Sequence, residues 1–155
     1  MKALTILQPF TSLVADRHKV YETRGWPTSY RGPIGIHAGA KGMDIRDLSG
    51  QMIVAAQQVL GISNFDKLPH GCVIAIADMV DCLRVTGRAS LKIGNEKHAV
   101  AILENGVRIM GNELLFGDYT IGRYAWQLEN VRPIEPVPAR GMQRIWNWEG
   151  EYEYL

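Results

Sequence analysis

The sequence contains few cysteines, no long hydrophobic run and almost no net charge. Cys72 and Cys82 are the only thiols among 155 residues, and they form no Cys-x-x-Cys pair, so neither a disulfide scaffold nor a zinc site is expected. The longest run of aliphatic residues covers residues 73–77, whereas a membrane-spanning helix needs roughly 20 apolar residues. The N-terminus shows no basic segment followed by an apolar one, as secretion signals do. We therefore expect a soluble, cytoplasmic protein without a membrane segment.

The motifs of several common enzyme classes are also missing. Neither a Gly-x-Ser-x-Gly elbow nor a glycine-rich phosphate loop occurs. The histidines are scattered, without the close spacing that metal sites show: His18, His37, His70 and His98. We therefore expect no metal and no cofactor. A doubly wound α/β fold is disfavoured, because strands and helices do not alternate regularly and the phosphate loop is missing.

The charged residues nearly balance, but they are unevenly distributed. Lysine and arginine number 17 against 16 acidic residues, for a formal net charge of +1, so the whole chain exerts no general attraction on nucleic acid. Residues 1–50 carry seven basic and four acidic residues, whereas residues 111–155 carry four and seven. This asymmetry is either ordinary surface variation or a local basic patch that could meet phosphate groups. The patch would contain Arg17, Lys19, Arg24, Arg31 and Lys41.

The apolar pattern predicts an α+β domain. Strands are expected at residues 3–7, 20–24, 32–38, 72–86 and 122–134, and a short helix is expected to begin near Pro9 and end near Arg17. A longer helix is expected to begin at Asp44, as its N-cap, and to stop at Gly61. Several strands, two early helices and a late aromatic strand favour a sheet that curls into a small β-barrel with flanking helices.

Residues 87–118 and the C-terminal tail are harder to interpret. Residues 96–103 are expected to form a helical turn or two, and the Gly/Asn pairs that follow indicate hairpins or a mobile insert. The acidic end of the chain, after Trp146 and Trp148, is expected to fray. The chain otherwise reads as a single domain over residues 1–155, with an insert at 87–118 as one interpretation.

The densest polar cluster is the Lys-x-x-Glu-x-Arg segment formed by Lys19, Glu22 and Arg24. In an extended segment Glu22 and Arg24 point to the same side. Lys19 joins them only if the turn from helix to strand lies between it and Glu22. The three groups then make either a surface salt bridge of about 0–1 kcal/mol or a site that recognises phosphate or a base. A desolvated lysine in this position could also act as a base or nucleophile.

Other polar and aromatic residues offer weaker signals. His37 on a strand is either a hydrogen-bonded structural residue or a catalyst. Trp26, among glycine and proline beside the basic cluster, either stacks on a base or covers an end of the barrel. Trp126, in an alternating strand, is expected in the core.

Both ends of the chain resemble the ASCH domains of the PUA-like superfamily. Gln8-Pro9-Phe10, Ser12-Leu13-Val14, the Lys-x-x-Glu-x-Arg segment and Trp26 are similar to the opening signature of that family. The closing segments are similar as well, and they comprise residues 122–128, the proline-rich residues 133–138, Gly141 and Ile145-Trp146. The resemblance implies a small β-barrel with a side cleft that binds RNA or a nucleotide-like ligand.

One branch of this family removes the acetyl group from N4-acetylcytidine, using a lysine, a threonine three positions later and a more distant glutamate. Lys19 matches the lysine, but Glu22 stands where the threonine is required, and Thr23 is expected on the opposite face of the strand. Other members resemble ribonucleases. In that case Lys19 or Arg24 would stabilise charge while Glu22 or His37 acts as a base.

These observations lead to three hypotheses. The first is binding of RNA or a modified nucleoside in a cleft that holds Lys19, Glu22, Arg24 and Trp26. The second is a hydrolase, amide-cleaving or phosphodiester-cleaving, with Lys19 and Glu22 as catalytic residues. The third is a protein-interaction module that uses exposed aromatic residues, which would gain support if Trp26 and Trp148 formed one exposed apolar patch. Further ligand-contacting residues are expected to be Gln8, Ser12, His37, Lys41 and Tyr124. The oligomeric state is left open.

Overall fold

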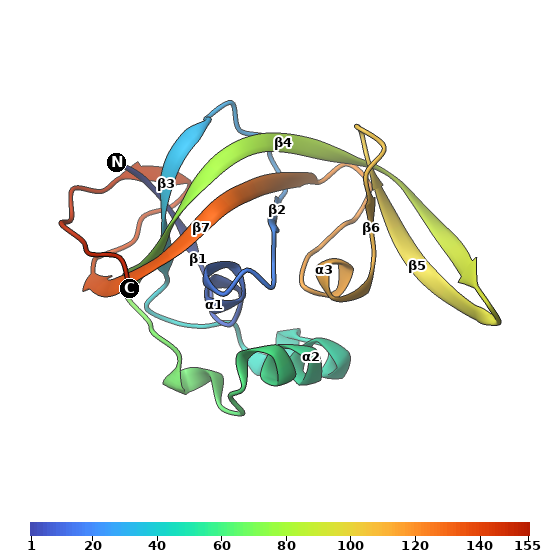
Figure 1. Ribbon diagram of the computed structural model, residues 1–155, viewed down its shortest axis with the longest axis horizontal. Helices are drawn as coiled ribbons and strands as arrows, with labels where there is room; N and C mark the ends of the chain where they lie inside the picture. The colour runs from blue at the N-terminus through green and yellow to red at the C-terminus, as the bar shows by residue number, and fades with distance from the viewer.

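The computed structural model describes residues 1–155 and consists mostly of β-strands, with few helices (Figure 1). The strands are β1 (Lys2–Ile6), β2 (Tyr21–Arg24), β3 (Gly32–Ala38), β4 (Cys72–Ile93), β5 (Glu96–Leu103), β6 (Arg108–Ile109), β7 (Tyr124–Pro138) and β8 (Ile145–Asn147). The α-helices are α1 (Phe10–Ala15), α2 (Gly50–Leu60) and α3 (Gly111–Leu115), and two short 3-10 turns cover Ile45–Asp47 and Phe65–Lys67.

The strands form one sheet in the order β2-β7-β4-β3-β1-β8. β1 and β3 run parallel, whereas the other neighbours in this order pair antiparallel. The sheet is not closed, because β2 and β8 stand at its two edges. The predicted barrel is therefore not confirmed, although the mixed and mainly β architecture agrees with the sequence pattern.

The 22-residue strand β4 belongs to two parts of the molecule. Its first part, up to Arg84, pairs with β3 and β7 in the body of the sheet. Its second part, from Val85 to Ile93, pairs with β5 in a two-stranded hairpin that projects beyond the body (Figure 1). We call this hairpin, residues 85–103, the arm. β6 pairs with β5 near the base of the arm.

The prediction of a helix at residues 96–103 is wrong, because these residues form β5. Glu96 pairs with Ile93, so Gly94 and Asn95 make a two-residue hairpin turn in which Gly94 has a left-handed φ of 60°. Pairing along the full second half of β4 supplies hydrogen bonds that outweigh the local helix preference of Glu96, Lys97 and Ala99. A Gly-Asn pair between two apolar segments is a hairpin signal.

The three α-helices lie on one side of the sheet (Figure 1). The prediction that Asp44 caps the long helix is wrong, because Asp44 accepts the backbone N–H of Arg46 and caps only the 3-10 turn. Ser49 is the N-cap of α2, and its hydroxyl accepts the N–H of Met52 at 3.1 Å. The predicted stop at Gly61 is confirmed, since Gly61 adopts a left-handed φ of 65° as the C-cap.

Four apolar clusters make the core. The largest fills the space between α1 and the sheet, and another joins α1 to α2 through Leu13, Met52 and Phe116. Trp126 is buried in the largest cluster, as predicted. No helix in the structure combines the length and the apolar character needed to cross a bilayer.

The C-terminal tail is packed rather than frayed, contrary to expectation. The ring of Tyr152 stacks on that of Trp148 with centroids 5.8 Å apart. Tyr154 forms a β-bridge with Ile134, and Glu135 donates its N–H to the carbonyl of Glu153. The aromatic residues therefore hold the acidic tail against β7.

Candidate functional site

A reversal of the chain between α1 and β2 brings Lys19 beside Glu22. α1 ends at Ala15, and Arg17 adopts a left-handed φ of 62°. The backbone N–H groups of His18 and Lys19 both donate to the carbonyl of Leu13. Lys19 therefore precedes the strand, so it lies on the same side as Glu22 instead of facing away from it.

The ammonium group of Lys19 is buried, with 1% of the residue exposed. Its Nζ atom donates to the carbonyl oxygen of Phe116 at 2.7 Å, lies 3.8 Å from Glu22 Oε1, and sits 5.6 Å from the centroid of the Phe10 ring. Burial lowers the pKa of Lys19, and the carboxylates of Glu22 and Glu113 oppose that shift. Two acceptors and an aromatic face thus hold a cation away from solvent.

Glu22 also contacts Arg24. The Arg24 Nη2 atom lies 3.1 Å from Glu22 Oε2 and donates to the carbonyl of Thr5 at 2.9 Å. The guanidinium carbon lies 5.9 Å from the centroid of the Trp26 ring and 5.8 Å from that of Trp126. Lys19, Glu22 and Arg24 therefore form a continuous chain of charges, which we call the charged triplet.

The charged triplet borders a cleft of about 530 Å³. Glu22, Thr23 and Arg24 line the cleft on one side, and Phe116–Asp118 with Arg123 line another. Its apolar surface comes from Ile6, Leu7, Phe10, Met43, Leu48, Met52 and Leu115. We call it the first cleft. Lys19 lies behind its wall and is not itself part of the lining.

Thr23 lies at the first cleft although strand alternation places it on the face opposite Glu22. Its hydroxyl oxygen accepts the backbone N–H of Asp118 at 3.0 Å, and Asp118 belongs to the wall of the cleft. Arg123 donates from Nε to the carbonyl of Asp118 at 3.1 Å and lies 3.4 Å from its carboxylate. The loop after α3 is thus tied to both β2 and the start of β7.

Glu113 on α3 also contributes to the site, although no sequence motif pointed to it. Its carboxylate accepts the backbone N–H of Val20 at 3.0 Å and that of Tyr21 at 2.8 Å. It fixes the start of β2 and adds negative potential near Lys19. Because Glu113 and Val20 are 93 positions apart in the sequence, no local motif spacing connects them. Residues 111–118, which fall in the segment interpreted as an insert, therefore supply part of the site.

Gln8 and Ser12 are buried at the N-terminal end of α1 rather than in the lining of the first cleft. The side-chain amide of Gln8 donates to the carbonyl of Pro69 at 2.8 Å, and its oxygen accepts the N–H of Ser12 at 3.0 Å. These contacts brace α1 against the segment that precedes β4. Both residues thus support the position of α1.

His37 is buried away from the charged triplet. Its Nε2 atom lies 2.7 Å from the carbonyl of Ala139, its Nδ1 lies 3.1 Å from the Thr5 hydroxyl, and its ring packs edge-on against Trp146. Burial lowers the pKa of His37. It therefore fits the interpretation as a hydrogen-bonded structural histidine.

The other expected ligand contacts do not line the first cleft. Lys41 is exposed, and Tyr124 is partly buried against the core cluster. Trp26 is 46% exposed, and its carbonyl accepts the indole N–H of Trp126 at 3.1 Å. Trp148 is buried under Tyr152 and does not form one exposed patch with Trp26, so the protein-interaction hypothesis does not gain the support that such a patch would give.

The family model for the ASCH domain matches residues 4–138 of this chain. The chain belongs to the ASCH domain family. The match includes the charged triplet, the first cleft and residues 87–118. ASCH domains are generally linked to RNA binding. No protein with a curated description matches the chain.

The site offers proton donors and acceptors but no cluster of metal ligands. Nowhere in the structure do three or more histidine, cysteine or carboxylate side chains lie close enough together to hold a metal ion. Cys72 is buried and Cys82 partly buried, and burial raises the pKa of both thiols. The first cleft offers a ligand ionic contact, hydrogen bonding and apolar contact.

Proposed function

We propose that the first cleft of this ASCH domain binds a nucleoside unit of single-stranded RNA. One observation carries this proposal: a carboxylate and a guanidinium, 3.1 Å apart, border a cleft whose remaining wall combines apolar side chains with a smaller number of polar and charged ones. Small-molecule sites are typically about 300–1,000 Å³ and combine apolar walls with a few placed polar groups. A cleft of about 530 Å³ is in that range.

The two charged groups suit the edges of a nucleobase and the ribose–phosphate chain. A carboxylate accepts hydrogen bonds from an exocyclic amino group or a ring N–H, and a guanidinium donates to a carbonyl or phosphate oxygen. Phe10, Leu48 and Met52 offer apolar surface to the flat face of a base. Recognition of unpaired bases by stacking and by their hydrogen-bonding edges is characteristic of RNA-binding proteins.

The charged triplet is held in place before any ligand arrives. The Thr5 carbonyl and Glu22 both accept from Arg24, and Lys19 lies against Glu22 from behind. Groups that are already oriented lose less entropy when a ligand binds. Lys19 therefore acts as a positioning residue, because it holds the Glu22 carboxylate from behind without lining the cleft.

Binding of nucleoside 5′-monophosphates and short single-stranded RNAs, followed by calorimetry and fluorescence anisotropy, tests this function. Glu22→Gln and Arg24→Lys should each weaken binding by about tenfold or more, since each removes a charged hydrogen-bonding partner. Lys67→Ala is the matched control, because Lys67 is exposed on the 3-10 turn Phe65–Lys67 and lines neither the first cleft nor its rim. Wild type and both cleft variants binding equally well would exclude the proposal.

Hydrolysis at the same cleft is a second candidate, favoured by the environment of Lys19. A buried amine with a lowered pKa, 3.8 Å from a carboxylate, is the setting in which lysine acts as a base. On N4-acetylcytidine, water would add to the acetyl carbon and the C–N bond would break, releasing acetate and cytidine. On RNA, a base would take the proton of the 2′-hydroxyl, the 2′-oxygen would bond to the adjacent phosphorus, and the P–O5′ bond would break with a proton passing to the 5′-oxygen, which leaves a 2′,3′-cyclic phosphate and a 5′-hydroxyl.

Product analysis after incubation with N4-acetylcytidine or single-stranded RNA distinguishes these reactions from binding alone. Turnover that is lost in Glu22→Gln and in Lys19→Met supports hydrolysis. Binding without products, or turnover that Glu22→Gln leaves unchanged, removes this second candidate and leaves the binding function standing.

A further inference from the structure

A second and larger groove adjoins the first cleft. It measures about 980 Å³ and lies between α2, the segment from α3 to Tyr119, and the arm. Leu115, Gly117 and Asp118 line both cavities, so the two meet across the loop that follows α3. A ligand larger than one nucleoside can therefore pass from the first cleft into this second groove without leaving the protein surface.

The wall formed by α2 carries alternating amide and apolar groups. Gln51, Val54, Ala55 and Gln58 line the groove at positions i, i+3, i+4 and i+7, which is a single face of the helix. Val54 is 51% exposed although it is aliphatic. Glutamine amides donate and accept hydrogen bonds as base edges do, and an exposed valine offers apolar surface to a base face.

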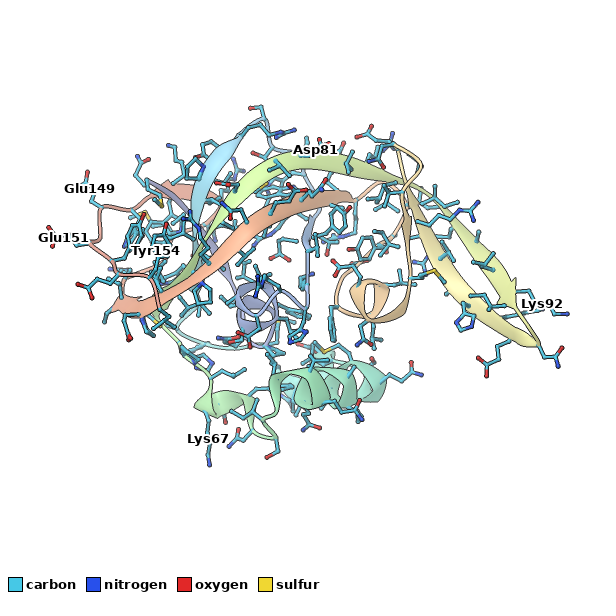
Figure 2. All side chains as sticks on the ribbon, viewed as in Figure 1. Lys67, Asp81, Lys92, Glu149, Glu151 and Tyr154 are labelled. Atoms are coloured by element: carbon cyan, nitrogen blue, oxygen red, sulfur yellow. The ribbon has the colours of Figure 1, made fainter.

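The arm forms the other wall and carries a row of cations. Arg88 lines the second groove, and its guanidinium donates to the carbonyl of Tyr119 at 3.3 Å. Because side chains alternate along a strand, Lys92 lies on the same face as Arg88, about 13 Å further along at about 3.3 Å per residue. Lys97 pairs directly with Lys92. Figure 2 shows Lys92 at the far end of the arm from the body.

The pairing of Lys92 with Lys97 is unfavourable in the protein alone. Like charges directly opposite one another on neighbouring strands destabilise the pair, and both residues are exposed. An anion bound between them would remove this repulsion. Asp118, the acidic residue in the lining of the second groove, is already paired with Arg123.

We infer that the second groove and the arm bind the continuation of the RNA strand whose nucleoside occupies the first cleft. This inference rests on the proposed function and names its substrate class, which is an extended single strand of several nucleotides rather than a free nucleoside. The glutamine face of α2 contacts bases, and Arg88, Lys92 and Lys97 contact phosphates. Proteins that hold single strands combine a positively charged groove with apolar platforms in this way.

The test measures affinity for single-stranded RNAs of one, two, four and eight nucleotides by competition anisotropy. Affinity should rise from one to eight nucleotides, because the added phosphates and bases contact the second groove and the arm. Arg88→Ala and the double variant Lys92→Ala/Lys97→Ala should weaken the octamer by about fivefold or more, and each lost phosphate contact should reduce the salt dependence of binding by about 0.7 in log–log slope. Mononucleotide binding should stay within about twofold of wild type, because these residues lie outside the first cleft.

Two outcomes overturn the inference while the proposed function survives. One is equal affinity for mononucleotide and octamer, and the other is octamer binding that none of the arm variants changes. An octaglutamate peptide that binds as tightly as the RNA octamer would also overturn it, since the arm would then be a site for acidic peptides. Failure of wild type to bind any nucleotide would instead remove both.

The variants are chosen so that loss of folding cannot imitate loss of binding. Lys92 and Lys97 are exposed at the tip of the arm, so their truncation touches no core cluster. Lys67→Ala removes an exposed lysine from a different part of the molecule (Figure 2) and should leave octamer affinity within about twofold. Unchanged melting temperatures for all variants complete the control.

Discussion

The buried ammonium of Lys19 donates a 2.7 Å hydrogen bond to the carbonyl oxygen of Phe116. The contact joins the start of β2 to the end of α3 across 97 positions of sequence. The same ammonium faces Glu22, so one cation holds the carboxylate of the charged triplet and closes the back of the first cleft. The positions of α3 and of the Glu22 carboxylate are therefore linked through a single side chain.

Replacing Lys19 with methionine should destabilise the fold by about 3–5 kcal/mol. The substitution removes a buried cation, so the Phe116 carbonyl loses its hydrogen-bond donor and Glu22 keeps only Arg24 as a cationic partner. Removing one member of a buried ion pair is the costly way to break it. Urea denaturation measures the change. Lys41→Met, at an exposed position, should change stability by less than about 0.5 kcal/mol.

Adding Glu22→Gln to Lys19→Met should recover part of that loss, because the second substitution removes a buried carboxylate that has lost one of its two cationic partners. A double-mutant cycle should therefore show a coupling energy of about 1 kcal/mol or more. Additive losses in the cycle would show that the two groups do not interact in solution.

Stability should fall as the pH drops below 6.5 because of His37. Nε2–H donates to the Ala139 carbonyl, so Nδ1 accepts from the Thr5 hydroxyl, whose oxygen in turn accepts from Trp146 Nε1 at 3.1 Å. This arrangement requires the neutral ring. Burial places the folded-state pKa of His37 below its ordinary 6.5. As the pH falls, the unfolded chain therefore binds the proton at a higher pH than the folded protein does, and the free energy of unfolding decreases.

The measurement is an NMR titration of the His37 ring together with denaturation between pH 7.5 and 5. His37→Gln should remove the part of the acid sensitivity that belongs to this residue. A titration midpoint above 6.5 would contradict the arrangement, because a raised pKa would make the folded state more stable at acid pH, with the opposite slope.

Gly117→Ala should disturb the first cleft. A Cβ atom at this position would lie 2.6 Å from Tyr119 Cε2 and 3.1 Å from Thr23 Cγ2, so the loop must shift. Overpacking of this kind typically costs about 1–3 kcal/mol. RNA affinity and thermal unfolding should both decrease. Gly50→Ala is the matched control for thermal unfolding, because a Cβ at that helical glycine meets nothing within 4 Å.

Ser49→Ala should destabilise the protein by about 1 kcal/mol, since it removes the N-cap of α2. Asp44→Ala should cost less, because Asp44 caps only one 3-10 turn and its ion pair with Arg46 is exposed. The melting temperatures of the two variants show which of the two residues contributes more to stability as a helix cap. A larger loss for Asp44→Ala would restore Asp44 as the residue that starts the helix.

Local pattern was sufficient to predict elements whose signals lie within a few residues. The strand at 32–38 coincides with β3, and Gly61 ends α2 as its left-handed cap requires. The strand β5 was missed because its residues favour a helix in isolation, and only its pairing with the distant end of β4 decides the outcome.

The residues of the candidate site also fall into two groups, those that local sequence could bring together and those that it could not. Lys19, Glu22 and Arg24 are close in sequence, so strand alternation and one turn were enough to group them. Glu113 and the Phe116 carbonyl reach the same place from α3, more than 90 positions away. No spacing rule connects such positions, since the fold alone brings them together.

Because β4 runs without interruption from the sheet into the arm, changes in its length act differently at its two ends. One extra residue at the base would flip every side chain beyond it to the other face. Two extra residues in each strand beside the Gly94–Asn95 turn would keep all faces and extend the hairpin by about 7 Å. The tip of the arm is therefore the place where insertions can change the length of the arm while the sheet stays intact.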